Sequence, residues 1–221
     1  MSSSAQPYLS PDEILKAYTL GYFPMARSRD DENVVWVLPD FRGVLDLAKA
    51  AAPRRLLRTL RAEPFAVTCD KAFRDVIAAC AESARGREET WINPMIETAY
   101  TELHVAGYAH SIECWRGDRL VGGLYGVSVG GVFCGESMFS RERDASKIAM
   151  LHLIARLKHA GYALLDTQFY TEHLAQFGVD EWTDADYQAA LRAHLPERPD
   201  FCAGPDQFST ASVAQSITQT S

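Results

Sequence analysis

The sequence predicts an α+β fold with a central, mostly antiparallel sheet, and three consecutive stretches carry that prediction. Residues 110–139 have a period of two with turns at residues 116–118 and 130–131, which indicates a meander of three strands. Residues 144–161 follow as a helix that is apolar over more than half of its circumference, as buried helices are. A further strand is expected within residues 162–170. Antiparallel strands, a buried helix and another strand together indicate an α+β layout.

The N-terminal half of the chain predicts helices. Ser10, Pro11 and Glu13 form a capping signature at the start of a helix. Further helices are expected at about residues 43–51 and 53–64, at residues 70–82 with Asp70 as the cap, and from Pro94 to residue 107.

These elements suggest two domains and a tail. We expect a small N-terminal domain at residues 1–43 and a larger domain at residues 44–205. Residues 206–221 are rich in Ser, Thr and Gln and have no periodic apolar face, so we expect a disordered tail there.

Composition limits the class of protein. The chain has 221 residues, of which 47% are hydrophobic and 23% charged, as in ordinary globular proteins. It has no apolar run near the ~20 residues that a membrane span requires, and its N-terminus does not have the pattern of a secretory signal. Five scattered cysteines without a CxxC pair indicate reduced thiols, neither a disulfide framework nor a zinc site. We therefore expect a cytoplasmic protein.

One stretch is basic, although the formal net charge of −7 argues against nonspecific coating of nucleic acid. In PRRLLRTLRAEP, residues 53–64, a helix would place Arg54, Arg58 and Arg61 on one face. That face is either a solvated surface or a patch that contacts phosphates.

Several common catalytic motifs are missing from the sequence, among them GxxxxGK[ST], HExxH and GxSxG. The order of elements is compatible with an acyltransferase of the GNAT type. The junction before the buried helix, SRERDASK, nevertheless contains no glycine-rich pyrophosphate loop, which disfavours a CoA donor.

Polar residues interrupt two apolar regions. In LLDTQ, Asp166 and Gln168 would share one face of a strand, which is either a strand end emerging into water or a carboxylate that orients an amide. Glu136 lies among apolar and small residues in FCGESMFSR and is either a surface or cap residue or the acid of an amine-binding pocket. Met150, Leu153 and Leu157 form a helical stripe that is either core or the floor of that pocket.

The sequence resembles leucyl/phenylalanyl-tRNA–protein transferases in GYFPM, WINPMIETAYTELHVAGYAHSIECW, LVGGLYGVSVGGVFCGESMFSR, ASK and LLDTQ, in this order. The resemblance covers most of residues 9–195. It implies a small N-terminal domain and a GNAT-like (acyl-CoA N-acyltransferase-like) C-terminal domain. It also implies transfer of Leu or Phe, and of Met less readily, from aminoacyl-tRNA to an N-terminal Arg or Lys, which marks the acceptor for the N-degron pathway.

The resemblance also implies roles for individual residues. Glu136 matches the acid that contacts the aminoacyl α-amine, and Asp166 and Gln168 match a proposed relay pair. The apolar pocket for a side chain unbranched at Cβ, with aromatic residues at the site, matches Leu124, Phe133, Met150, Leu153, Leu157, Leu165, Trp91 and Tyr100. The arginine face, with Arg27 and Arg29 as secondary candidates, would receive phosphates of the tRNA acceptor stem.

The sequence departs from the family pattern at a few positions. Met25 stands where tryptophan is common after Phe-Pro, and Leu153 and Leu157 stand where phenylalanine can occur. Thr171 stands where asparagine can occur, and fewer residues precede the first helix.

The expected mechanism is direct transfer without a covalent enzyme intermediate, and without a metal, a nucleotide or CoA. Glu136 would hold the donor amine, and Asp166 would hold Gln168 so that its amide oxygen accepts a hydrogen bond from the attacking amine. Two alternatives stay open: a CoA-dependent N-acetyltransferase, and a module that binds aminoacyl-tRNA without catalysis.

Overall fold

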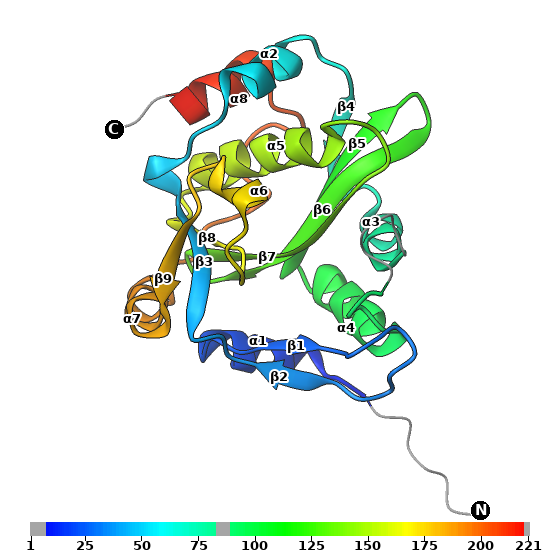
Figure 1. Ribbon diagram of the computed structural model, residues 1–221, viewed down its shortest axis with the longest axis vertical. Helices are drawn as coiled ribbons and strands as arrows, with labels where there is room; N and C mark the ends of the chain where they lie inside the picture. Colours follow the sequence, from blue (N-terminus) through cyan, green and yellow to red (C-terminus); the bar gives the residue numbers. More distant parts are fainter. Residues whose placement is uncertain (1–7, 83–88, 219–221) are drawn as a thin grey trace, which may run out of the picture.

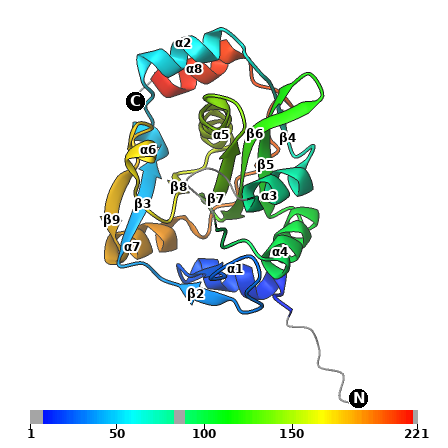
Figure 2. The ribbon, with the colours of Figure 1, turned by 45° about the vertical axis from the view of Figure 1, so that its right-hand side comes forward.

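Figures 1 and 2 show a computed structural model of the chain, which describes residues 8–82 and 89–218. The elements in these ranges are, in order, α1 (Pro11–Thr19), β1 (Phe23–Met25), β2 (Val35–Val37), β3 (Phe41–Asp46), the 3₁₀ turn η1 (Leu47–Lys49), α2 (Arg54–Arg61), β4 (Ala66–Cys69), α3 (Phe73–Ala81), α4 (Pro94–Val105), β5 (Ala109–Arg116), β6 (Arg119–Val129), β7 (Val132–Ser140), α5 (Ala145–Ala160), β8 (Leu164–Asp166), α6 (Glu172–Ala175), β9 (Asp180–Thr183), α7 (Asp184–His194) and α8 (Thr210–Thr218).

A seven-stranded sheet forms the centre, with the strand order β4-β5-β6-β7-β8-β3-β9. Its neighbouring strands are antiparallel except β7 and β8, which run parallel. Parallel neighbours need a crossover, and α5 supplies it. The predicted α+β fold with a mostly antiparallel sheet is therefore confirmed.

Helices cover both faces of this sheet. On one face lies α5, with α2 and α8 packed on its outer side (Figure 1). Gly122 of β6 allows that close packing, because a Cβ atom there would lie 2.5 Å from the Cβ of Ala145 at the start of α5. The other face is covered by α1, α3 and α4, and the two-stranded sheet of β1 and β2 lies beside α1 (Figure 2).

Two local predictions in the N-terminal half are wrong. Residues 43–51 form most of β3 and then η1 instead of a helix, and Val44 and Leu45 are fully buried within the sheet. Asp70 does not cap α3, because its carboxylate instead accepts a hydrogen bond from the backbone N–H of Ser111 on the neighbouring strand.

The expected disorder of residues 206–221 is also wrong for residues 210–218. These residues form α8, which packs against α5 and α2 and buries Val213, Ala214 and Ile217. Three small or branched apolar residues at helical spacing are enough to make a short inner face on a polar helix. Residues 219–221 of the expected tail lie outside the described residues.

Candidate active site

Glu136 lies at a β-bulge in β7, and the bulge carries its carboxylate into the protein. The pairing with β6 skips one residue, since Tyr125 lies opposite Ser137 while the next residue of β6 lies opposite Gly135. Glu136, between those two, has no partner on β6. A bulge of this kind bends a strand and redirects a side chain. Only 7% of Glu136 is exposed, so an acid from an otherwise apolar strand becomes buried.

Three polar side chains surround the Glu136 carboxylate. Nε2 of Gln168 donates a hydrogen bond to Oε1 at 2.8 Å, and the Tyr100 hydroxyl donates one to Oε2 at 3.1 Å. The hydroxyl of Tyr18 lies 2.6 Å from that of Tyr100, so α1 also reaches the site. Burial raises the pKa of Glu136 to about 7, although the two tyrosine hydroxyls lower it. At neutral pH the carboxyl group is therefore divided between its charged and neutral forms.

Gln168 lies just beyond the end of β8 in a left-handed backbone conformation, with φ at 57°. Asp166, the fully buried last residue of β8, accepts a hydrogen bond at 2.8 Å from the backbone N–H of Gln168. The sequence predicted a carboxylate that orients the amide side chain across one strand face. That geometry is wrong, because β8 ends at Asp166 and its carboxylate holds the Gln168 backbone, whereas Glu136 holds the amide group.

Arg42 of β3 fixes the position of Asp166. Its Nε and Nη2 atoms donate to the two carboxylate oxygens at 2.9 and 2.7 Å, and the Arg42 and Asp166 side chains are only 1% and 0% exposed. The Tyr187 hydroxyl donates another hydrogen bond to this carboxylate at 2.8 Å. The guanidinium carbon also lies over the rings of Phe23 and Tyr187, 5.0 and 4.4 Å from their centroids. The bidentate pair and the Tyr187 hydrogen bond leave Asp166 little freedom to move.

Sequence reasoning missed Tyr18, Arg42 and Tyr187. The two tyrosines match the apolar faces of their helices and give no separate signal. Arg42 does give a signal, because it is a charged residue in the otherwise apolar stretch FRGVL, but the sequence predicted the start of a helix there and not a strand.

An apolar cavity of about 230 Å³ opens beside Glu136. Four of the predicted pocket residues line it, namely Leu124, Met150, Leu153 and Leu165. The sequence did not predict the rest of its wall, which consists of Tyr125, Gly135, Ser137, Met138, Thr167 and Leu174. The cavity is therefore formed by the sheet, by α5 and by α6.

Four other predicted residues do not line this cavity. Phe133 and Leu157 are fully buried in the core on the α5 side, where Phe133 stacks on an aromatic ring from the C-terminal segment. Trp91 is half-buried and packs against the core on the opposite face of the sheet. Tyr100 reaches the site through its hydrogen bond to Glu136 instead of through the cavity wall.

Two hollows elsewhere are larger than this cavity. One of about 510 Å³ lies between α5 and the segment around α8, and one of about 600 Å³ lies beside α1 and β2. Neither is lined by a buried carboxylate. Of these three spaces, the one beside Glu136 combines apolar walls with a buried ionisable group, which is typical of a binding site.

The arginine face is present on α2. Arg54, Arg58 and Arg61 are all exposed, while the leucines of the same helix are buried. Of the two secondary candidates, Arg27 is exposed, and Arg29 pairs with a glutamate of α4 at 3.1 Å.

The fold and the site together define an α+β protein with an apolar cavity that has a buried carboxylate in its wall. Within the described ranges, every helix is too short or too polar to cross a membrane.

The chain belongs to the leucyl/phenylalanyl-tRNA protein transferase family, whose model matches residues 44–192, while the model of the family's N-terminal domain matches residues 8–40. It is 53% identical over 210 residues to the leucyl/phenylalanyl-tRNA–protein transferase of Maricaulis maris, which covers 95% of this chain and 97% of that one. Identity is 52% over 214 residues with the enzyme of that name from Phenylobacterium zucineum and 51% over 210 with that from Caulobacter vibrioides, at the same coverage. The resemblance seen in the motifs is confirmed, and the protein is an aminoacyltransferase.

Two solved structures align with most of the chain. One is a protein of unknown function from Staphylococcus epidermidis, with 9% identity and a TM-score of 0.41 over 81% of this chain and 66% of that one. The other is L-PGS from Bacillus licheniformis, with 11% identity and a TM-score of 0.41 over 82% and 62%. Likeness at this level carries no argument about fold or function.

Proposed function

We propose that this protein transfers Leu or Phe, and Met less readily, from aminoacyl-tRNA to the N-terminal Arg or Lys of acceptor proteins. Family membership supports the reaction class. The observation that carries the assignment of the site is the buried Glu136 carboxylate in the wall of an apolar cavity. Acceptors modified in this way would carry the N-terminal residue that directs proteins to the N-degron pathway.

The donor amino acid would bind with its side chain in the cavity and its α-ammonium group on Glu136. Burying a Leu or Phe side chain contributes about 1.5–3 kcal/mol, and the flexible Met138 and Met150 adapt the cavity to either shape. Adding or removing one methylene group changes the free energy of binding by only about 1–3 kcal/mol, so such a pocket accepts several apolar residues. The ammonium group would also favour the ionised form of Glu136, whose pKa is about 7 in its absence.

The donor ester is already activated, so the chain mainly has to position two substrates. The acceptor amine, as the free base, attacks the ester carbonyl carbon. The new C–N bond forms, the C–O bond to the ribose breaks, and the proton lost from the amine ends on the ribose hydroxyl. This chemistry requires no metal, nucleotide or CoA.

Gln168 would assist the attack through its amide oxygen. Its amide nitrogen donates to Glu136, and among the described residues none donates a hydrogen bond to Oε1 of Gln168. That oxygen is available to accept a hydrogen bond from the acceptor amine as positive charge develops on it. Asp166 acts through Gln168 as a positioning residue, because its carboxylate holds the backbone of Gln168 in the left-handed conformation.

The tRNA would bind along α2. Arg54, Arg58 and Arg61 are exposed on one helix face, so they are available for acceptor-stem phosphates. Arg27 is a secondary candidate, and Arg29 is a weaker one because its guanidinium is already paired.

Three broader proposals accompany this assignment. The large domain is GNAT-like, as the order of the β5–β6–β7 meander, α5 and the parallel strand β8 suggests. The domain boundary lies near residue 43, between the ranges 8–40 and 44–192 that the two family models match, although residue 43 itself is part of β3. The protein works in the cytoplasm, where charged tRNA is found.

The test mixes purified protein with radiolabelled Phe-tRNA or Leu-tRNA and a peptide that begins with Arg, with an Ala-initiated peptide as the control. We expect label to move only to the Arg peptide. Binding of charged tRNA without any transfer of label would instead support a non-catalytic binding module. Acetylation of the peptide with acetyl-CoA would support the CoA-dependent alternative.

A further inference from the structure

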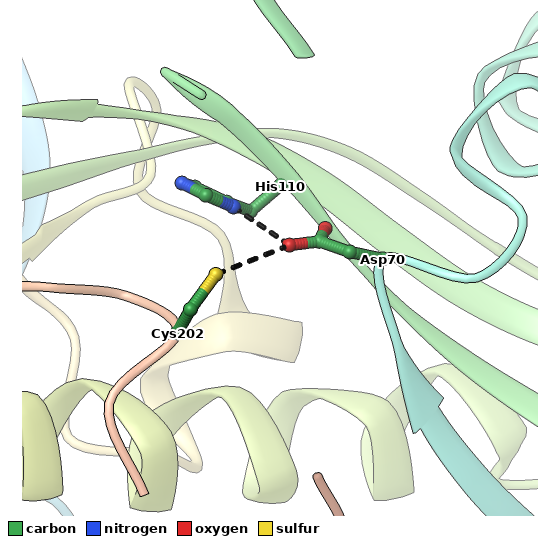
Figure 3. Close-up of side chains that lie close together, drawn as sticks. All are labelled: Asp70, His110 and Cys202. Atoms are coloured by element: carbon green, nitrogen blue, oxygen red, sulfur yellow. Dashed lines mark hydrogen bonds and ion pairs between the residues drawn. The ribbon is translucent and has the colours of Figure 1, made fainter. Parts of the chain in front are cut away.

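Asp70, His110 and Cys202 come from distant parts of the sequence and meet at one place in the fold (Figure 3). Asp70 follows β4, His110 is the second residue of β5, and Cys202 lies in a turn between α7 and α8. One ligand atom of each lies within 4.8 Å of the others. Nδ1 of His110 is 2.8 Å from Oδ2 of Asp70, and Sγ of Cys202 is 4.0 Å from the same oxygen. The reaction proposed above does not use this cluster.

Asp70 is held so that one carboxylate oxygen faces the cluster. Its backbone is in the left-handed region, with φ at 56°, where residues other than glycine are uncommon. Its Oδ1 accepts a hydrogen bond at 2.8 Å from the backbone N–H of Ser111. The contacts to His110 and Cys202 therefore fall on Oδ2.

The other two side chains are also positioned by their surroundings. The His110 ring is only 6% exposed and stacks on Phe201, with centroids 4.0 Å apart and planes 16° apart. Because Phe201 directly precedes Cys202, this stack brings the thiol to the imidazole. The backbone N–H of Cys202 donates to Asp200 at 2.9 Å, which fixes the turn.

The local charge favours a cation. Asp70 and Asp200 are both carboxylates, and a metal-bound Cys202 would add a thiolate. One nearby positive charge is that of Arg156, whose guanidinium lies 5.7 Å from the centroid of the Phe201 ring. That guanidinium is already engaged by backbone carbonyls of the C-terminal segment.

We propose that Asp70, His110 and Cys202 bind one Zn²⁺ ion. Carboxylate oxygen, imidazole nitrogen and thiolate sulfur are the ligands that zinc takes, at about 2.0–2.3 Å. Ligand atoms around a tetrahedral ion at these lengths lie roughly 3.5 Å apart. The two separations from Asp70, 2.8 and 4.0 Å, lie on either side of that value, and all three ligand atoms lie within 4.8 Å of one another, so shifts of about 1 Å would form the site. Water would fill the fourth position, because Cys202 is exposed.

The ion would act on the stability of the fold, because the reaction proposed above does not use this cluster. Zinc would fasten the segment between α7 and α8 to the ends of β4 and β5, and so support α8 where it packs on α5. No short sequence motif predicts the site, because its ligands at positions 70, 110 and 202 are 40 and 92 positions apart. Folding alone assembles them.

The test uses the full chain, stripped with a chelator and titrated with Zn²⁺ against a chromophoric competitor. We expect one equivalent to bind, and the melting temperature to rise as the ion binds the folded state. With Co²⁺ as the probe, a thiolate-to-cobalt charge-transfer band should appear. Cys202→Ser should weaken Zn²⁺ binding at least tenfold and remove that band.

Cys69→Ser is the matched control, since Cys69 neighbours Asp70 but lies outside the ligand group. It should bind Zn²⁺ like the original chain, as long as its melting temperature without metal is unchanged. His110→Gln should lose affinity as Cys202→Ser does. The proposal is overturned if the stripped chain takes up no stoichiometric Zn²⁺, or if Cys202→Ser binds as tightly and gives the same cobalt spectrum.

Discussion

Glu136 is buried as a carboxylate, and this lowers the stability of the folded chain at neutral pH. Its pKa rises from 4.5 to about 7, chiefly because burial disfavours the charged form. The unfolded chain loses this proton near pH 4.5 and the folded chain only near pH 7. Stability from this group is therefore fully present below pH 4.5 and falls as the pH rises to 7, by a total of the order of 3 kcal/mol. A residue kept at such a cost is a strong candidate for function.

Glu136→Gln tests this argument, because glutamine imitates the protonated acid. At about pH 8 the variant should melt at least about 3 °C above the original chain, and the difference should vanish below pH 4.5. Donor binding should weaken at least tenfold, since the α-ammonium group loses its counter-charge. Thermal melts across pH and donor titrations measure both effects. Unchanged donor use in this variant would show that Glu136 does not recognise the amine.

Arg42→Lys tests whether the buried ion pair positions Gln168. Lysine keeps the charge but not the two-pronged contact with Asp166, so the turnover number should fall about tenfold or more. The KM for the donor should change less than about threefold, because Arg42 does not line the cavity.

Arg141→Lys supplies the control, since Arg141 contacts both carboxylate oxygens of Glu82 at 2.8 Å at the surface, where it is 45% exposed. This control variant should leave both the turnover number and the KM for the donor unchanged. If Arg42→Lys lowers the free energy of unfolding but leaves the turnover number intact, Arg42 has only a structural role.

At the scale of elements, α8 is part of the core on the α5 face. Ile217 is 3% exposed, so Ile217→Ala should lower the free energy of unfolding by about 2 kcal/mol or more. Gln215→Ala, at an exposed position of the same helix, should change the free energy of unfolding by less than about 0.5 kcal/mol. Denaturant unfolding measures both variants. Equal stability of the two would mean that α8 is not docked in solution.

The arginine face of α2 predicts a salt-dependent contribution to tRNA binding. Arg58→Gln should reduce the slope of log K against log salt concentration by about 0.7–0.9 if this side chain contacts one phosphate. Arg192→Gln, at an exposed position on α7, should leave the slope unchanged. Filter binding at several salt concentrations decides the matter, and equal slopes for the two variants would remove α2 from the tRNA interface.

At the scale of the whole molecule, local patterns predicted the β5–β6–β7 meander and the buried helix α5, because period and turn signals lie within short windows. They failed at β3, whose apolar run of few residues does not distinguish a strand from a helix. They failed again at α8, where the inner face becomes evident only once α5 is there to cover it. The structure of such short elements therefore cannot be predicted without the elements that pack against them.

The candidate site was predicted only in part for the same reason. The sequence singled out Glu136, Asp166 and Gln168 as polar residues in apolar surroundings, and the fold brings them together. It could not show that Arg42 of β3 would pair with Asp166, because 124 positions separate them. It also could not show the bulge that turns Glu136 inward, which depends on the register between two strands.

The most direct test of the account measures single-turnover transfer and donor binding in Gln168→Ala, with Gln176→Ala at the C-cap of α6 as the control. Both are run at about pH 8, above the Glu136 pKa of about 7, so that its carboxylate form is favoured. The account predicts that Gln168→Ala transfers about 100-fold more slowly or worse at saturating donor, with a donor Kd within about threefold of the original. An unchanged rate at saturating donor, with weaker donor binding, would contradict the proposed role of Gln168 in the attack.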